Sequence, residues 1–241
     1  MFKNYVFDFY HIYYKKIIFL DINYLTGCNK MLLEDLLSFL RRRKIQRGDT
    51  MWPNDIVALR EQLGIYDNTG PREAASILYD AIFDKEENRR SGMFATNLEE
   101  ILDKLHIQAY YADMSEVFPD TLNARDNISA CIINNNEERI IYINKCDGPR
   151  RQRFSVAHEI GHYILQHLEE SGGEILYRNE RATLGIDSRE ISANRFASSL
   201  LMPKYLVEIM YNRGFTVEMM ADAFLVSNQV VTYRLQQLKL I

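Results

Sequence analysis

The chain has 241 residues, and 29 Lys and Arg against 33 Asp and Glu give it a net charge of −4 at neutral pH. With 47% hydrophobic and 26% charged residues, the composition is that of a globular protein and excludes general disorder. The length allows one large domain or two small ones, and the mild acidity disfavours a nucleic-acid binder. Three cysteines without CxxC spacing exclude a disulfide framework, so we expect a reducing, cytoplasmic compartment.

Residues 1–25 contain nine aromatic side chains, yet polar residues interrupt every apolar run in this segment. The interrupting residues are Asp8, His11, Lys15, Lys16 and Asp21. We therefore predict neither a membrane span nor a secretory signal here. We favour an aromatic arm that packs on the body of the protein. The alternatives are a partner-docking arm and a true start further on, at Met31 or Met51.

The rest of the N-terminal region is predicted to be helical. Leucines at helical spacing indicate a helix over 31–43, and its terminal basic run suits a helix C-terminus. A second helix is predicted over 53–63, because a proline lies at its start and Gly64 just past its end. A third helix is expected from Pro71 to about Lys85.

The pattern changes near residue 95. Thr96 and Glu99 form a capping box, which predicts a helix that ends near Leu105. Strand-like runs follow at 107–112, 128–133 and 139–144. The last two flank a polar loop and are expected to form a hairpin.

Helical patterns return in the last third of the chain. Helices are predicted over 151–167 and over 188–201, where Pro203 stops the second. The last 28 residues are typical of a helix–turn–helix, with Ser227 as a good N-cap of its second helix. With a boundary in the charged stretch 84–92, the predicted divisions are a helical N-terminal region with the aromatic arm, a catalytic domain and a tail, over 1–90, 91–210 and 211–241.

The chemistry-bearing motif is HExxH, formed by His158, Glu159 and His162 within the first of those helices. Side chains four residues apart lie about 40° apart around a helix, so both imidazoles can hold one metal ion. Glu159 lies about 100° round from His158, where its carboxylate can accept a proton from the attacking water.

A catalytic zinc needs a third protein ligand. A metzincin would place Gly at 165 and His at 168, but Leu165 and Leu168 stand there, which excludes that class. His167 follows His162 by five residues, about 140° around a helix, so we expect it to point away as a surface or packing residue.

A carboxylate on the second helix is the remaining type of ligand. Glu190 follows His162 by 28 residues, which is enough for a loop and an antiparallel return. Asn194 lies one turn further along the same face and is expected to hydrogen-bond a ligating histidine. Weaker ligand candidates are Asp187, Glu180 and Glu174.

Two blocks of sequence resemble the signature of the ImmA/IrrE family of metallopeptidases: RQRFSVAHEIGHY at 151–163 and EISANRFASSLLMP at 190–203. The resemblance covers about 95–241. It implies that His158, His162 and Glu190 bind Zn²⁺ and that Glu159 is the base. Ser192 departs from the pattern, since many members have Glu there.

The resemblance further implies a cytosolic bacterial or mobile-element protease. Such proteins cleave a helix-turn-helix repressor, or a comparable regulator encoded nearby, to induce a stress, phage or conjugative-element response. One alternative is a toxin or defence effector with the same chemistry and another target. A second is a non-catalytic regulator that binds a partner or DNA on the same fold.

The predicted fold is α+β: a zincin-like domain with a small mixed sheet, a helical N-terminal region and a helix-turn-helix tail. Tyr163 and Tyr177 are candidate donors to the transition state, although buried packing is the alternative for both. The second tail helix carries Arg234, with Lys239 just beyond it, which is too little positive charge for a typical DNA reader. We therefore favour packing or protein recognition for the tail.

Overall fold

The computed structural model describes residues 52–85, 94–134, 138–167 and 188–241. The chain forms two compact units, 1–52 and 53–241, and every element described below belongs to the second. The aromatic arm and the helix at 31–43 lie outside the described residues, as does most of the charged stretch at 84–92. The division into three regions therefore stays a prediction.

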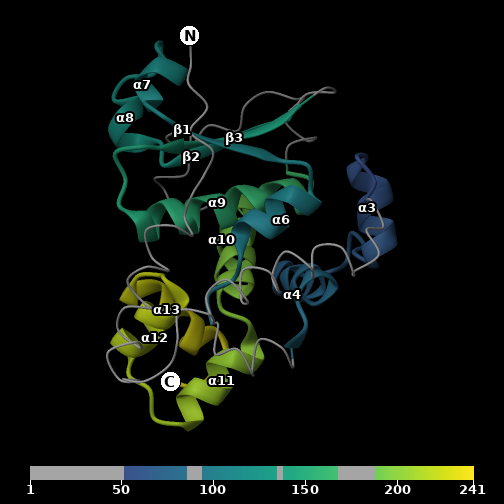
Figure 1. Ribbon diagram of the computed structural model, residues 1–241, viewed down its shortest axis with the longest axis vertical. Helices are drawn as coiled ribbons and strands as arrows, with labels where there is room; N and C mark the ends of the chain where they lie inside the picture. The colour runs from purple at the N-terminus through teal and green to yellow at the C-terminus, as the bar shows by residue number, and fades with distance from the viewer. Residues whose placement is uncertain (1–51, 86–93, 135–137, 168–187) are drawn as a thin grey trace, which may run out of the picture. The chain divides into compact units, whose positions relative to one another are not determined.

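The described strands form one small mixed sheet. They are β1 (Gln108–Ala112), β2 (Ala130–Asn134) and β3 (Arg139–Asn144), in the order β1-β3-β2. β1 runs parallel to β3, and β2 runs antiparallel to it, which confirms the hairpin (Figure 1). β2 therefore lies at an edge of this sheet.

The first helices are shorter than predicted. α3 (Ile56–Leu63) begins after Asp55, whose carboxylate accepts from the Ala58 N–H, so the proline at 53 precedes the helix. Gly64 ends α3 in the left-handed conformation, with φ of 74°. α4 (Pro71–Ile82) ends three residues before the expected position.

The capping box at Thr96 is a wrong prediction. α6 (Leu98–Lys104) is capped by Asn97, whose side-chain oxygen accepts from the Glu100 N–H. The Thr96 hydroxyl instead donates to the Leu200 carbonyl at 2.8 Å, so it ties this segment to helix α10. Two short helices that the sequence did not indicate follow, α7 (Met114–Val117) and α8 (Ala124–Asn127).

Two helices at the centre of the domain position the site. α9 (Pro149–Ile164) packs beneath β2 and β3, and α10 (Ser188–Leu201) packs against both α9 and α4 (Figure 1). Their contact is almost solvent-free, and burying this apolar surface is the main term that holds the two helices together. The fully buried residues include Val156, Ala157, Ile160, Phe196, Ala197 and Leu200.

Three further helices complete the chain: α11 (Lys204–Asn212), which was not predicted, α12 (Val217–Phe224) and α13 (Asn228–Gln237). The turn between α12 and α13 uses Leu225 at φ of 56°, and the Ser227 hydroxyl caps α13 by accepting from the Val230 N–H. This confirms the predicted helical pair. Among the described helices, none has both the length and the hydropathy that crossing a membrane requires.

Candidate metal centre

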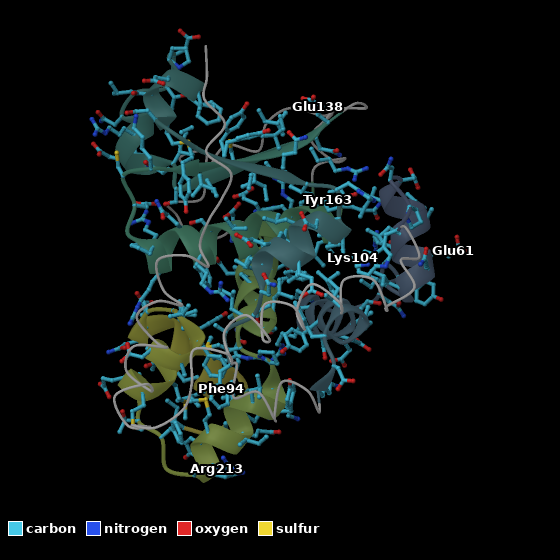
Figure 2. All side chains as sticks on the ribbon, in the orientation of Figure 1. Glu61, Phe94, Lys104, Glu138, Tyr163 and Arg213 are labelled. Carbon is cyan, nitrogen blue, oxygen red and sulfur yellow. The ribbon has the colours of Figure 1, made fainter. Side chains whose placement is uncertain are left out.

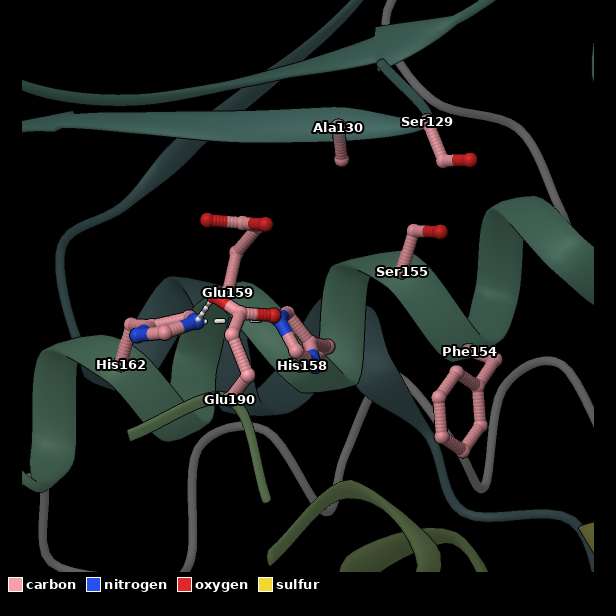
Figure 3. A pocket seen from close by; sticks show the side chains of 8 residues that line it. All are labelled: Ser129, Ala130, Phe154, Ser155, His158, Glu159, His162 and Glu190. Carbon is pink, nitrogen blue, oxygen red and sulfur yellow. Dashed lines mark hydrogen bonds and ion pairs between the residues drawn. The ribbon is translucent and has the colours of Figure 1, made fainter. Parts of the chain in front are cut away.

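The HExxH residues lie within α9 and point into one pocket. His158, Glu159 and His162 are 6%, 7% and 2% exposed. All three polar side chains are therefore buried. Figure 3 shows the two imidazoles side by side with the Glu190 carboxylate in front of them. Buried polar groups need partners, and the two histidines find them in each other and in Glu190.

The donor atoms of His158, His162 and Glu190 converge. The two Nε2 atoms are 2.9 Å apart, and each lies 3.2 Å from a Glu190 carboxylate oxygen. Bonds of about 2.0–2.2 Å place the ligands of a tetrahedral zinc ion about 3.4 Å from one another. The observed spacings are close to this value, so the three residues fit a single small cation.

α10 brings Glu190 to the histidines. Glu190 lies in the first turn of α10, and its side chain is 20% exposed. Burial alone would raise the pKa of its carboxyl, but the hydrogen bonds and charges of His158 and His162 outweigh that effect. The pKa of Glu190 therefore lies well below its usual range, and the residue is a carboxylate at neutral pH, as metal binding requires.

Asn194 contacts His158 at the ring nitrogen that does not face Glu190. Its side-chain oxygen lies 3.0 Å from His158 Nδ1. An amide oxygen only accepts, so this contact places an imidazole hydrogen on Nδ1 and points Nε2 toward Glu190.

His167 is not one of the three converging ligands, as expected, but the prediction that it points away from His162 is wrong. α9 ends at Ile164, and Gln166 takes the left-handed conformation with φ of 58°. The predicted rotation of about 140° between His162 and His167 assumed a continuous helix, so it does not apply. The chain turns back, and His167 Nδ1 lies 3.0 Å from His162 Nδ1.

Glu159 occupies the same pocket on the side of the sheet. Figure 3 shows its carboxylate between α9 and the strand that carries Ala130. It is close enough to the Cys131 thiol for its charge, together with the larger effect of burial, to raise the pKa of that thiol to about 12. The pocket is lined by Ser129, Ala130, Phe154, Ser155, His158, Glu159, His162 and Glu190.

Four of these lining residues were not predicted from the sequence. Phe154 and Ser155 lie four and three residues before His158, and this helical spacing could have indicated them. Ser129 and Ala130 line the pocket because they precede and begin β2, which could be recognised only once the strand was placed over α9.

The other candidates lie elsewhere. Tyr163, labelled in Figure 2, is buried and does not line the pocket. The guanidinium of Arg139 lies 5.1 Å from the centre of its ring. The alternative ligands Asp187, Glu180 and Glu174, and the candidate donor Tyr177, lie outside the described residues.

Two histidines four residues apart, a glutamate between them and a carboxylate from a second helix are the residue set of an HExxH metallopeptidase. Residues 122–236 match the IrrE N-terminal-like domain of the M78 peptidases, and this range contains the whole site. Residues 122–236 therefore form an IrrE N-terminal-like domain, and this match points to a metalloprotease.

A curated relative agrees with this assignment. The chain is 38% identical over 79 residues to the radiation response metalloprotease IrrE of Deinococcus radiodurans. That match spans 32% of this chain and 23% of the relative, so most of the relative lies outside it. Among solved structures, a Mycobacterium tuberculosis transcriptional regulator is similar with a TM-score of 0.40 and 16% identity, over 68% of this chain and 51% of that one.

Proposed function

We propose that this protein is a zinc-dependent endopeptidase that cleaves a regulatory protein, such as a helix-turn-helix repressor encoded nearby. The observation that carries the proposal is the convergence of three metal-ligand atoms in one pocket that also holds Glu159. The IrrE N-terminal-like domain supports the peptidase chemistry, and the identity of the substrate rests on the family resemblance.

Each residue of the site has a distinct part in this proposal. His158 and His162 hold the metal through Nε2, and Glu190 holds it through a carboxylate oxygen. When bound, zinc supplies a Lewis acid that polarises the scissile carbonyl and makes water easier to deprotonate. Glu159 accepts the proton of the attacking water and delivers it to the nitrogen of the leaving amine.

The surroundings of the pocket favour a peptide substrate. β2 pairs with β3 on one side, and its first residue, Ala130, lines the pocket. An extended peptide can add to an edge strand through main-chain hydrogen bonds, with its side chains in adjacent pockets. A substrate bound along β2 would pass directly by Glu159.

The tail supports a protein target rather than DNA. Arg234, the cation of the second tail helix, is only 4% exposed. Its Nε donates to the Met202 carbonyl at 3.1 Å, and its Nη1 donates to the Ser199 hydroxyl at 2.8 Å. A guanidinium committed to these partners does not reach phosphates, which leaves packing or protein recognition as the role of the tail.

The test is co-expression with the product of the adjacent regulator gene. We expect the parent protein to cut that regulator at a defined bond, identified by mass spectrometry of the fragments, and the Glu159→Gln variant to leave it intact. Glu61→Gln, an exposed position on α3, is the matched control and should cut like the parent. Equal cutting with and without Glu159 would sink the proposal.

Other outcomes identify the rival functions. Fragments from unrelated host proteins, with an intact regulator, would indicate a toxin or defence effector that uses the same residues. A regulatory effect that survives Glu159→Gln unchanged, in a protein that binds no zinc, would indicate a non-catalytic regulator.

A further inference from the structure

The ring of His167 backs the ring of His162 on the side opposite the proposed metal. The two ring centres are 5.0 Å apart, and the planes meet at 71°. The Nδ1 atoms lie 3.0 Å apart, which is hydrogen-bond distance. The backbone N–H of His167 also donates to the His162 carbonyl at 3.0 Å, so the main chain holds the second ring against the first.

This contact bears on which nitrogen of His162 carries hydrogen. A neutral imidazole has one N–H, and His162 has possible acceptors on both sides of its ring. His158 Nε2 at 2.9 Å and a Glu190 carboxylate oxygen at 3.2 Å face its Nε2, and His167 Nδ1 at 3.0 Å faces its Nδ1. With the hydrogen on Nε2, His162 points an N–H into the site and cannot bind a metal there. With the hydrogen on Nδ1, it donates to His167 and keeps the Nε2 lone pair for the metal.

The other ligating histidine has the same arrangement with a different partner. His158 Nδ1 donates to the Asn194 side-chain oxygen at 3.0 Å. Partners of this kind orient a ligating imidazole and fix its tautomer, and removing them typically costs 10–100-fold in metal affinity. The usual partner is a carboxylate, a carbonyl or water, whereas here a second histidine stands in that place for His162.

We propose that His167 is a positioning residue, which accepts the Nδ1 hydrogen of His162 and so directs Nε2 toward the metal. This inference rests on the proposed metal centre. It assigns a role to a histidine outside the HExxH motif and beyond the end of α9. The left-handed Gln166 is what makes the contact possible, because it returns the chain toward the helix.

The test compares His167→Ala, which removes the acceptor, with His167→Asn, whose amide oxygen can take the place of Nδ1. The first readout is long-range ¹⁵N–¹H NMR of the histidine rings in the metal-free protein. We expect the share of His162 that carries its hydrogen on Nδ1 to be larger in the parent and in His167→Asn than in His167→Ala, because Glu190 and His158 compete for that hydrogen at Nε2.

The second readout is the zinc Kd from competition with a chelator. We expect His167→Ala to raise it by about 10–100-fold and His167→Asn to restore most of the affinity. His106→Ala, an exposed histidine on a separate segment, should leave it unchanged.

Parent-like affinity and parent-like tautomers in His167→Ala would overturn the positioning role while leaving the metal centre intact. Equal weakening by Ala and Asn in folded protein would also overturn it, because a lost acceptor would then not be the cause. A parent protein that binds no zinc would instead overturn the proposed metal centre, and the positioning role with it.

Discussion

Gly161 of α9 lies directly against Phe196 of α10. A Cβ built on Gly161 would lie 3.1 Å from Phe196 Cδ1 and 3.3 Å from the Ala193 carbonyl oxygen, which is closer than ordinary van der Waals contact. This contact occurs one residue before His162 and six residues after Glu190 along α10. Because Gly161 has no side chain, α10 can approach α9 closely enough for the Glu190 carboxylate to reach His158 and His162.

Substituting Gly161→Ala should force α9 and α10 apart. We expect a loss of up to about 2 kcal/mol in the free energy of unfolding, because an overpacking penalty of about 1–3 kcal/mol exceeds the gain of about 1 kcal/mol in helix propensity. The zinc affinity should also fall, since Glu190 moves with α10. Urea unfolding and chelator competition measure the two effects.

Gly148→Ala is the matched control, because a Cβ there meets nothing within 4 Å. If Gly148→Ala and Gly161→Ala behave alike, the close contact does not set the position of Glu190.

Substituting Asn194→Ala should weaken zinc binding by about 10–100-fold, because His158 loses the acceptor for its Nδ1 hydrogen. Asn194→Asp keeps an acceptor oxygen and should bind more tightly than Asn194→Ala. The zinc Kd of each variant is the measurement.

Ser192→Ala, two residues earlier on the same helix, is the control and should bind zinc like the parent. A loss in Ser192→Ala equal to that in Asn194→Ala would contradict the contribution of the hydrogen bond.

The core of the site could be predicted from local sequence pattern. The HExxH motif lies within a single helix, and helical geometry alone places His158 and His162 on one face. Predicting Glu190 as the third ligand required knowing which two helices pack together. The spacing along the sequence left several carboxylates as candidates, and the family resemblance favoured Glu190. The strands of the sheet followed from three short strand-like runs, two of which are rich in β-branched residues.

The two misses both lie at the end of a helix, one at its C-terminus and one at its N-terminus. We predicted the direction of His167 by extending α9 past Ile164. Gln166 instead adopts a left-handed conformation, which the sequence pattern does not predict for a residue other than glycine. The capping box failed because Thr96 found a better acceptor in Leu200, more than 100 residues away in sequence. Tertiary contacts of this kind override local preferences.

Substituting Arg234→Ala should destabilise the protein by about 1–3 kcal/mol, because the Met202 carbonyl and the Ser199 hydroxyl lose a buried donor. Burial lowers the pKa of this guanidinium to about 10, so it remains charged at neutral pH. Nonspecific DNA binding should not change. Urea unfolding and a DNA mobility-shift assay test both statements.

Arg213→Ala, an exposed cation at the end of α11, is the control and should change stability little. A folded Arg234→Ala protein of parent stability with weakened DNA binding would contradict a structural role for this arginine.

The Cys131 thiol should make stability depend on alkaline pH. Burial, and then the charge of Glu159, raise the pKa of this thiol from 9.0 to about 12. The unfolded chain therefore ionises first, so the stabilisation is complete below pH 9 and is lost as the pH rises toward 12. At pH 10 the loss should be about 1 kcal/mol relative to pH 8.

Urea unfolding at pH 8 and pH 10 measures this effect, with Cys131→Ala as the comparison that should lack it. In a Cys28→Ser background, iodoacetamide at pH 8 should modify the exposed Cys146 and spare Cys131. Rapid modification of Cys131 in the folded protein would show that the thiol is neither buried nor raised in pKa.

The most direct test of the account is the zinc stoichiometry and Kd of the purified chain and two single variants. We predict one zinc per parent chain, a Kd raised at least about 100-fold in Glu190→Ala, and parent-like binding in Glu159→Gln, because Glu159 is the base and not a ligand. Unchanged zinc binding in Glu190→Ala, or its loss in Glu159→Gln, would contradict the proposed metal centre.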